Sequence, residues 1–166
     1  MNLIFLFAVA YLLGSLSPGY FFGKVVKKID IREYQNRNTG AANTYRLVGP
    51  AYGIIAGIFD ALKAVLAYFA AIRGLSFIGL ERISPDFAIL AGLAAAAGHI
   101  WPFYLRFKGG RGAASLAGLG VITTYYTQSW YAFSFLIASA IYLLILNEVK
   151  FEAPLRKVLK LAGAVF

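Results

Sequence analysis

The chain has 166 residues, of which 60% are apolar and 14% are charged, and its mean hydropathy is +0.70. This composition excludes an intrinsically disordered chain and disfavours a soluble domain, which is typically about half apolar and a quarter charged. With no cysteine, one histidine and a net charge of +9, the sequence excludes disulfides and cysteine or histidine metal clusters, and it indicates a membrane protein with a surface that faces anions.

Apolar runs at residues 3–22, 47–72 and 87–105 predict the first three membrane-spanning helices. A helix needs about 20 mainly apolar residues to cross a bilayer. The first run has no preceding cationic segment and stays apolar beyond residue 10, so we expect a retained helix rather than a cleaved signal peptide. Its second half contains Gly14, Ser15, Ser17 and Pro18, which predict a distorted or closely packed helix.

Two further runs, at residues 112–126 and 130–146, predict a fourth and a fifth span. The fourth run is barely long enough to cross the hydrocarbon core. The turn between the two is flanked by aromatic residues of the kind that line membrane surfaces, namely Tyr125, Tyr126, Trp130 and Tyr131. We therefore expect an all-α, polytopic bundle of about five transmembrane helices, with residues 1–166 forming a single integral-membrane domain.

The distribution of lysine and arginine predicts the orientation of this bundle. These residues concentrate in the connections 23–46 and 106–111 and in the tail after residue 146. The loop 73–86 carries only Arg73 and Arg82, and the turn 127–129 carries neither residue type. Because cytoplasmic loops are enriched in lysine and arginine, we expect an outside N-terminus and a cytoplasmic C-terminus.

The first cytoplasmic loop, residues 30–46, combines asparagines, a glycine and several cations just before an apolar helix. Amide donors and guanidinium groups close to a helix N-terminus can bind an oxyanion. An ordinary basic loop attracted to anionic lipid is the alternative interpretation.

The second cytoplasmic loop reads Lys108-Gly109-Gly110-Arg111-Gly112 and precedes the fourth predicted span. Glycines let backbone N–H groups approach a ligand closely, and the two cations add positive charge, so a phosphate group is a plausible ligand. The spacing differs from that of a P-loop. A flexible basic turn is the alternative, but two such loops on one face favour a binding site.

Three ionisable residues fall inside the predicted spans. Asp60 and Lys63 lie three residues apart on one helix face, which predicts an intramembrane pair with a functional or a packing role. His99 lies in the cytoplasmic half of the third span, where it can act as a general base, bind phosphate or simply pack against a carbonyl group.

These motifs resemble those of the bacterial integral-membrane acyl-phosphate:glycerol-3-phosphate acyltransferases. The matching segments are Gly14-Ser15-Leu16-Ser17-Pro18 with Gly23-Lys24, Asn38-x-Gly40-Ala41-x-Asn43-x-x-Arg46, Asp60-x-x-Lys63, Gly98-His99-Ile100-Trp101-Pro102 and Phe107-Lys108-Gly109-Gly110-Arg111-Gly112. The resemblance implies transfer of an acyl group from acyl phosphate to the 1-hydroxyl of glycerol 3-phosphate, which gives lysophosphatidic acid. It also implies a multi-pass protein of the bacterial inner membrane with a cytoplasmic active face, in contact with membrane lipid.

The resemblance also assigns site residues. The expected catalytic residues are Asn38, Asn43, Arg46, His99 and Lys108. The expected phosphate-binding residues are Gly40, Lys108, Gly109, Gly110, Arg111 and Gly112, with the glycines exposing backbone amides. Asn38 and Asn43 would either contact a substrate or brace their loop. The family transfers the acyl group directly, so no acyl-enzyme nucleophile, metal or cofactor is implied, and we expect no nucleic-acid partner.

The chain departs from the family pattern at several positions. Where the family has Gly-Ser-Gly-Asn, this chain reads Gln35-Asn36-Arg37-Asn38, and Arg111 and Ala64 replace a lysine and a glycine. Family members are generally longer, with seven spans and a late histidine motif, so we expect a divergent, C-terminally short member. The alternative function is a catalytically degenerate protein that binds phospholipid headgroups or phosphorylated metabolites. A small transporter is less favoured, because the sequence shows no internal repeat.

Overall fold

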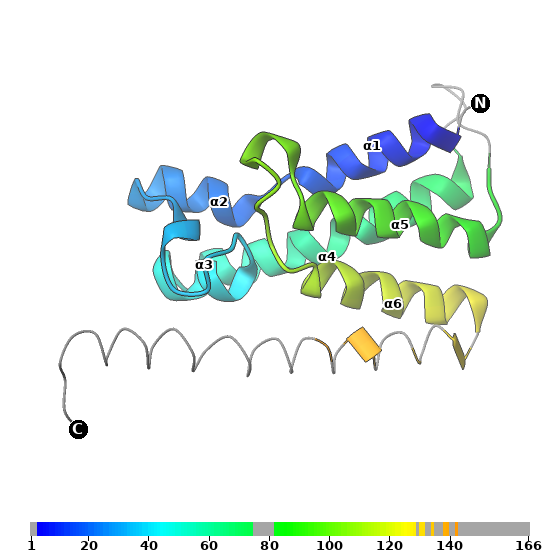
Figure 1. The fold of residues 1–166 in the computed structure, drawn as a ribbon. Helices are drawn as coiled ribbons and strands as arrows, with labels where there is room; N and C mark the ends of the chain where they lie inside the picture. The colour runs from blue at the N-terminus through cyan, green and yellow to red at the C-terminus, as the bar shows by residue number, and fades with distance from the viewer. Residues whose placement is uncertain are drawn as a thin grey trace.

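The structure, a computed structural model, describes residues 3–74 and 82–128, together with residues 130, 131, 134, 138, 139 and 142. Its α-helices are α1 (Leu3–Ser15), α2 (Pro18–Phe22), α3 (Ala41–Leu47), α4 (Pro50–Arg73), α5 (Pro85–Ile100) and α6 (Ala113–Thr127). A π-helical turn, Gly23–Lys27, continues α2, and short 3-10 turns lie at Ile31–Glu33 and Phe103–Leu105. The described residues contain no strand, and the predicted all-α membrane bundle is confirmed (Figure 1).

Among the described residues, three helical stretches are long and apolar enough to cross a membrane, namely Leu3–Lys27, Pro50–Arg73 and Pro85–Leu105. They coincide with the first three predicted spans. Helix α6 has 15 residues and is about 22 Å long, which is shorter than a hydrocarbon core of about 30 Å. The left-handed residues Gly112 and Gln128 bound it at its two ends, and its bounds agree with the predicted run 112–126 to within one residue.

The fifth predicted span, residues 130–146, lies mostly outside the described residues. The positions described within it are helical. The number of spans and the orientation of the two termini therefore stay predictions.

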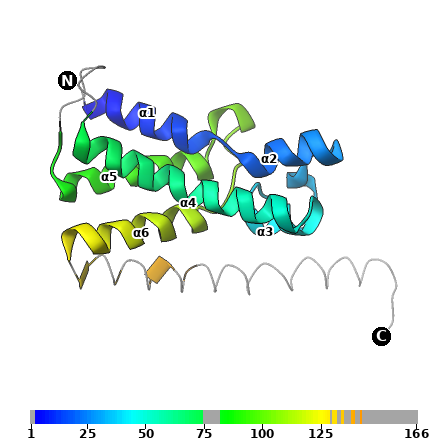
Figure 2. The ribbon, with the colours of Figure 1, turned by 180° about the vertical axis from the view of Figure 1, so that it is seen from behind.

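The helices pack closely because small residues face one another. Helix α5 packs against α1, α4 and α6, as both views of the ribbon show (Figures 1 and 2). A Cβ atom on Gly14 would overlap the backbone of Ala95, and one on Gly98 would overlap the carbonyl of Tyr11. Such close contacts between backbones are typical of membrane helix bundles. They confirm the close packing that the first span predicts.

The outer face of α4 is apolar and exposed. Its large apolar side chains recur every four residues at Ile54, Ile58, Leu62 and Leu66, and they are 48–57% exposed. One helix face of this kind favours contact with lipid. The opposite face of α4 carries the buried residues Asp60 and Lys63, so this helix separates lipid from the polar interior.

The first span is interrupted between α1 and α2, as its sequence predicts. The break at Ser17 and Pro18 leaves carbonyl groups at the end of α1 without their usual helical partners. The hydroxyl of Tyr104 donates to the carbonyl oxygen of Ser15 at 2.9 Å, and Lys63 Nζ donates to that of Leu16 at 2.9 Å. The break therefore provides an acceptor that holds Lys63 inside the bundle.

Candidate functional site

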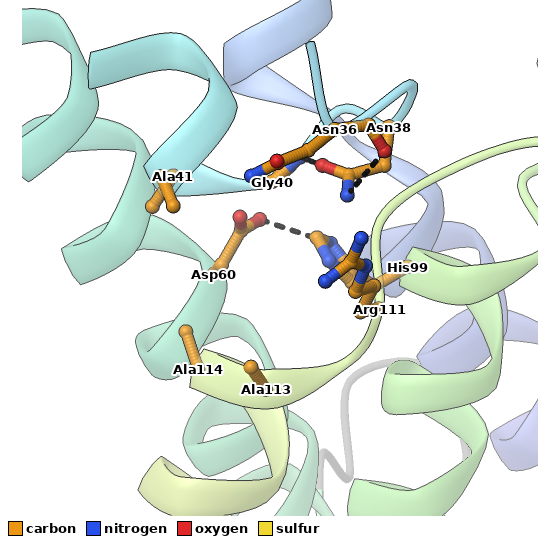
Figure 3. A pocket seen from close by; sticks show the side chains of 10 residues that line it. Asn36, Asn38, Gly40, Ala41, Asp60, His99, Arg111, Ala113 and Ala114 are labelled. Carbon is orange, nitrogen blue, oxygen red and sulfur yellow. Dashed lines mark hydrogen bonds and ion pairs between the residues drawn. The ribbon is translucent and has the colours of Figure 1, made fainter. Parts of the chain in front are cut away.

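A pocket of about 260 Å³ opens where four segments meet. They are the loop 30–46, called the asparagine loop below, the middle of α4, the end of α5 and the start of α6. It is lined by Asn36, Asn38, Gly40, Ala41, Ala42, Asp60, His99, Arg111, Ala113 and Ala114. Figure 3 shows the asparagine loop on one side, the start of α6 on the other, and Asp60, His99 and Arg111 between them. The two loops with predicted anion-binding residues thus converge on one cavity.

Asn43 is fully buried and braces the asparagine loop. Its Nδ2 donates to the carbonyl oxygens of Ile31 at 2.7 Å and Asn38 at 2.8 Å, and its Oδ1 accepts from the backbone N–H of Asn36 at 3.1 Å. Because its amide is used within the loop, Asn43 lies outside the pocket lining. Of the two roles expected for this residue, the structure favours bracing the loop.

Asn38 lines the pocket and shapes the turn into α3. Its Oδ1 accepts from the backbone N–H of Gly40 at 2.9 Å, and its Nδ2 donates to the carbonyl oxygen of Asn36 at 3.2 Å. The carbonyl oxygen of Gly40 in turn accepts from the backbone N–H groups of Asn43 and Thr44 in α3. Asn36, Asn38 and Gly40 therefore form one rigid wall of the pocket.

Asn36 is presented by two residues in left-handed backbone conformations. Gln35 has a φ of 49° and Arg37 a φ of 51°. These are the positions where the resembled family has glycine, the residue that adopts this conformation without steric cost. The loop thus has a backbone conformation that glycine adopts most easily, although larger residues occupy both positions. The Oδ1 of Asn36 accepts a hydrogen bond from Arg46 Nη1 at 3.3 Å.

Replacing Gln35 and Arg37 together by glycine should stabilise this loop. Both side chains are exposed, so their removal costs little packing, while glycine relieves the left-handed backbone. Part of this gain is offset by the larger entropy of the unfolded chain, so we expect a rise of up to about 1 kcal/mol in the free energy of unfolding. The melting temperature in detergent measures it. Glu33→Gly, at an exposed right-handed position, should lower the melting temperature, and an equal loss in both variants would contradict the prediction.

The loop 108–112, called the glycine loop below, folds back on the end of α5. The N–H of Gly109 donates to the carbonyl of Ile100 at 3.0 Å, and that of Gly110 donates to the carbonyl of His99 at 2.9 Å. The expectation that these two glycines expose their amides is therefore wrong for this structure. The absence of a side chain at Gly110 instead makes room for the ring of His99, which a Cβ atom at this position would overlap.

The cations of the two loops are divided between the pocket and its surroundings. Arg111 is half-buried and lines the pocket, and Gly112 is buried in a left-handed conformation just before α6. Lys108 and Arg46 are exposed and lie outside the lining. The structure thus brings Arg111 and the start of α6, but not Lys108 or Arg46, into direct contact with the cavity.

The ionisable residues of the spans form one buried network beside the pocket. Lys63 Nζ and Asp60 Oδ1 are 2.8 Å apart, and both side chains are almost completely buried. His99 Nδ1 lies 2.8 Å from Lys63 Nζ and 3.1 Å from Asp60 Oδ1. The predicted pair therefore forms, and the histidine joins it.

Arg32, which is paired with Asp30, connects the two loops, and no sequence motif predicted this contact. Arg32 Nη1 donates to the carbonyl oxygens of Leu105 at 2.8 Å and Lys108 at 3.2 Å, and Arg32 Nη2 pairs with Asp30 Oδ2 at 2.7 Å. A second link joins Thr39 N–H to the carbonyl of Gly109 at 3.2 Å. The only sequence signal was an acidic and a basic residue two positions apart, which is too common to indicate a long-range contact.

Asp30→Asn should remove an acid-sensitive contribution to stability. The hydrogen bond from Arg32 lowers the pKa of Asp30 below its usual 3.8. A lowered pKa means that ionised Asp30 stabilises the fold above 3.8, and that this contribution disappears as the pH falls through the lower folded-state value. We expect the variant to melt at a lower temperature than the wild type at neutral pH, with the difference shrinking below pH 3.8. Glu33→Gln is the matched control, and a constant difference would contradict the prediction.

Comparisons with known proteins identify the family of the chain. A family model described as glycerol-3-phosphate acyltransferase matches residues 4–163. Glycerol-3-phosphate acyltransferases of Streptococcus thermophilus and Enterococcus faecalis are each 38% identical to the chain, over 76% and 82% of its length. That of Macrococcus caseolyticus is 42% identical over 72% of the chain. The matches cover 57–58% of these relatives, so the chain spans little more than half of their length.

Solved structures support the fold. The crystal structure of PlsY (YgiH), an integral membrane glycerol 3-phosphate acyltransferase, in its glycerol 3-phosphate form superposes with a TM-score of 0.59 and 24% identity. The match covers 86% of this chain and 76% of that one. The lysophosphatidic acid form gives a TM-score of 0.58. Together with the family match over most of its length, these similarities show that the chain belongs to the glycerol-3-phosphate acyltransferase family.

Proposed function

We propose that the chain transfers an acyl group from acyl phosphate to the 1-hydroxyl of glycerol 3-phosphate. The observation that carries this proposal is the pocket itself, in which Arg111, the start of α6 and the asparagine loop meet beside Asp60 and His99 in a member of this family. Its relatives are named glycerol-3-phosphate acyltransferases, and PlsY has a glycerol 3-phosphate form and a lysophosphatidic acid form.

The electrostatics of the pocket suit phosphorylated substrates. Arg111 contributes a guanidinium group, which can bind two phosphate oxygens at once. The 15-residue helix α6 begins at Ala113 and points its positive N-terminal end at the same space. Arg46 and Lys108, which are exposed outside the lining, would raise the local concentration of anionic substrates.

The proposed reaction needs little covalent chemistry from the protein. The 1-hydroxyl oxygen of glycerol 3-phosphate forms a bond to the acyl carbon, and the bond between that carbon and the phosphate oxygen breaks. The hydroxyl proton is carried away by the products, with inorganic phosphate leaving in its hydrogen phosphate form. Holding the two anionic substrates side by side and stabilising charge at the acyl centre are the tasks left to the site.

The setting of this reaction is part of the same proposal. The described helices embed the chain in a membrane. The cationic loops that border the pocket favour a cytoplasmic active face at the bacterial inner membrane, with residues 1–166 acting as one domain. Acyl phosphate, glycerol 3-phosphate and membrane lipid are the proposed partners, and nucleic acid is not among them.

The test is acyl transfer by the purified chain in lipid nanodiscs, with acyl phosphate and radiolabelled glycerol 3-phosphate. Labelled lysophosphatidic acid is the expected product. Arg111→Ala should reduce its formation by roughly 100-fold, the usual loss for a group that stabilises reacting charge. Arg73→Ala, at the far end of α4, is the matched control and should keep full activity. Equal rates in the two variants would refute the role of Arg111.

One observation favours the alternative of a catalytically degenerate binding protein. Asn36 lines the pocket where the resembled family has serine, and it provides an amide in place of a hydroxyl. In that case glycerol 3-phosphate would bind in an equilibrium assay, Arg111→Ala would weaken the binding, and no lysophosphatidic acid would form. Measuring binding and turnover on the same sample separates the two functions.

A further inference from the structure

The hydrogen bonds of Lys63 fix the role of the buried histidine. An ammonium group has three N–H donors and no acceptor. Lys63 Nζ has three neighbours at hydrogen-bonding distance, namely the carbonyl oxygen of Leu16 at 2.9 Å, Asp60 Oδ1 at 2.8 Å and His99 Nδ1 at 2.8 Å. One N–H of the ammonium group can point at each of these atoms, which makes His99 Nδ1 an acceptor, although Asp60 Oδ1 also lies 3.1 Å from that nitrogen.

The charge balance of the network supports this assignment. The Lys63 and Asp60 side chains are 1% and 2% exposed, and their opposite charges cancel. A proton on His99 Nδ1 could bind Asp60 Oδ1 at 3.1 Å only beside the ammonium group of Lys63, which is 2.8 Å from the same nitrogen. A doubly protonated ring would leave a net positive charge buried in the bundle. Arg111 lines the same pocket and would add to the repulsion. A neutral Lys63 would instead leave the carboxylate of Asp60 uncompensated.

The other ring nitrogen, Nε2, takes no part in the hydrogen bonds of this network. His99 Nε2 lies against Gly110, where a Cβ atom would overlap it. It has no hydrogen-bond partner among the residues that the structure describes, and His99 lines the cavity. A neutral ring whose Nδ1 accepts a hydrogen bond carries its proton on Nε2.

We propose that Lys63 is a positioning residue that holds His99 as the neutral Nε2–H tautomer, so that His99 donates a hydrogen bond to an anionic oxygen of a bound substrate and does not act as a general base. The assignment of the oxygen to a substrate rests on the proposed function. The tautomer rests only on the buried network. In this arrangement the basic nitrogen of the ring, Nδ1, is covered by Lys63, and Nε2, which has no partner among the described residues, has a proton to give.

The sequence makes a direct test possible, because His99 is the single histidine of the chain. The chain is labelled with ring-¹⁵N histidine, purified with an affinity tag that contains no histidine, and studied by NMR in lipid nanodiscs at neutral pH. We expect Nδ1 to resonate as an unprotonated, pyridine-type nitrogen and Nε2 as a protonated, pyrrole-type nitrogen. A protonated Nδ1 in the wild type would overturn the proposal.

Two variants separate the positioning role of Lys63 from a general structural role. In Lys63→Met the ammonium donor is gone, so the proton should move to Nδ1 and bind Asp60. Ser115→Ala is the matched control, because it removes another buried hydrogen bond to Asp60, from the serine hydroxyl to the Asp60 carbonyl oxygen at 2.7 Å, without touching the ring. It should leave the tautomer unchanged. A shift in both variants, or in neither, would count against Lys63 as the cause.

Activity gives an independent check on the donor role. Glutamine can donate an N–H from about the position of Nε2 but is not a base at neutral pH. We expect His99→Ala to lose roughly 100-fold in acyl transfer and His99→Gln to recover a clear part of that loss. Equal loss in the two variants would refute donation by Nε2. If the wild type forms no product but shows the expected tautomer, the proposed function fails while the assignment of Lys63 and His99 stands.

Discussion

Gly110→Ala should abolish acyl transfer and destabilise the bundle. The new methyl group would occupy the space of the His99 ring. The ring cannot move aside cheaply, because its Nδ1 is hydrogen-bonded to the buried Lys63 at 2.8 Å. The loop cannot move without losing the hydrogen bond between Gly110 N–H and the His99 carbonyl. We expect a loss of about 1–3 kcal/mol in the free energy of unfolding, the usual cost of overpacking, together with loss of product formation.

A double variant identifies the cause of this effect. His99→Ala removes the ring that the methyl group would meet, so Gly110→Ala should cost much less stability in that background than in the wild type. Detergent unfolding of the wild type, the two single variants and the double variant forms a complete cycle. Additive losses would show that the clash with His99 is not the reason, and retained turnover in Gly110→Ala would show that the pocket tolerates the methyl group.

The sequence predicted the first three spans well because each is a long apolar run. The bounds of α6 were predicted to within one residue, although its 15 residues are too few to cross the hydrocarbon core. Spacing also predicted the pairing of Asp60 with Lys63, because residues three apart share one helix face. Local rules of this kind need no knowledge of how the helices are arranged.

The composition of the pocket depended on contacts between distant segments. The sequence indicated two anion-binding loops, and the structure brings them to one cavity. The sequence could not indicate that the amides of Gly109 and Gly110 donate to carbonyl groups at the end of α5. Nor could it indicate that the side-chain amide of Asn43 is hydrogen-bonded within its own loop. The contacts of Arg32 with residues 105 and 108 are equally non-local. Glycine content alone predicts close approach, but not which group approaches.

The family was identified from its motifs, because composition and charge alone did not indicate it. Composition and charge led to a membrane protein with an anion-binding face, and the long motif around His99 and Lys108 led to the family. Its departures are informative as well. Gln35 and Arg37 adopt a left-handed backbone without being glycine, so the surrounding hydrogen bonds help to determine the conformation of this loop.

Breaking the buried ion pair from one side should cost more stability than removing it completely. Lys63→Met leaves the carboxylate of Asp60 buried without its cation, and Asp60→Asn leaves the ammonium of Lys63 without its anion. Loss of one partner from such a pair typically costs about 3–5 kcal/mol, because the remaining charge has lost its compensation. We expect each single variant to lose this much in the free energy of unfolding, measured by denaturation in mixed micelles.

The variant Asp60→Asn with Lys63→Met removes both charges and should recover a large part of that loss. Recovery is expected to be incomplete, because the double variant also lacks the donor to the Leu16 carbonyl and the support of the His99 ring. The partly buried pair of Asp30 and Arg32 provides the contrast, because its side chains are 14% and 22% exposed. Asp30→Asn should cost much less than Asp60→Asn, since water can solvate the remaining arginine. If the losses at positions 60 and 63 were additive, or no larger than that at Asp30, burial would not govern the energetics of this network.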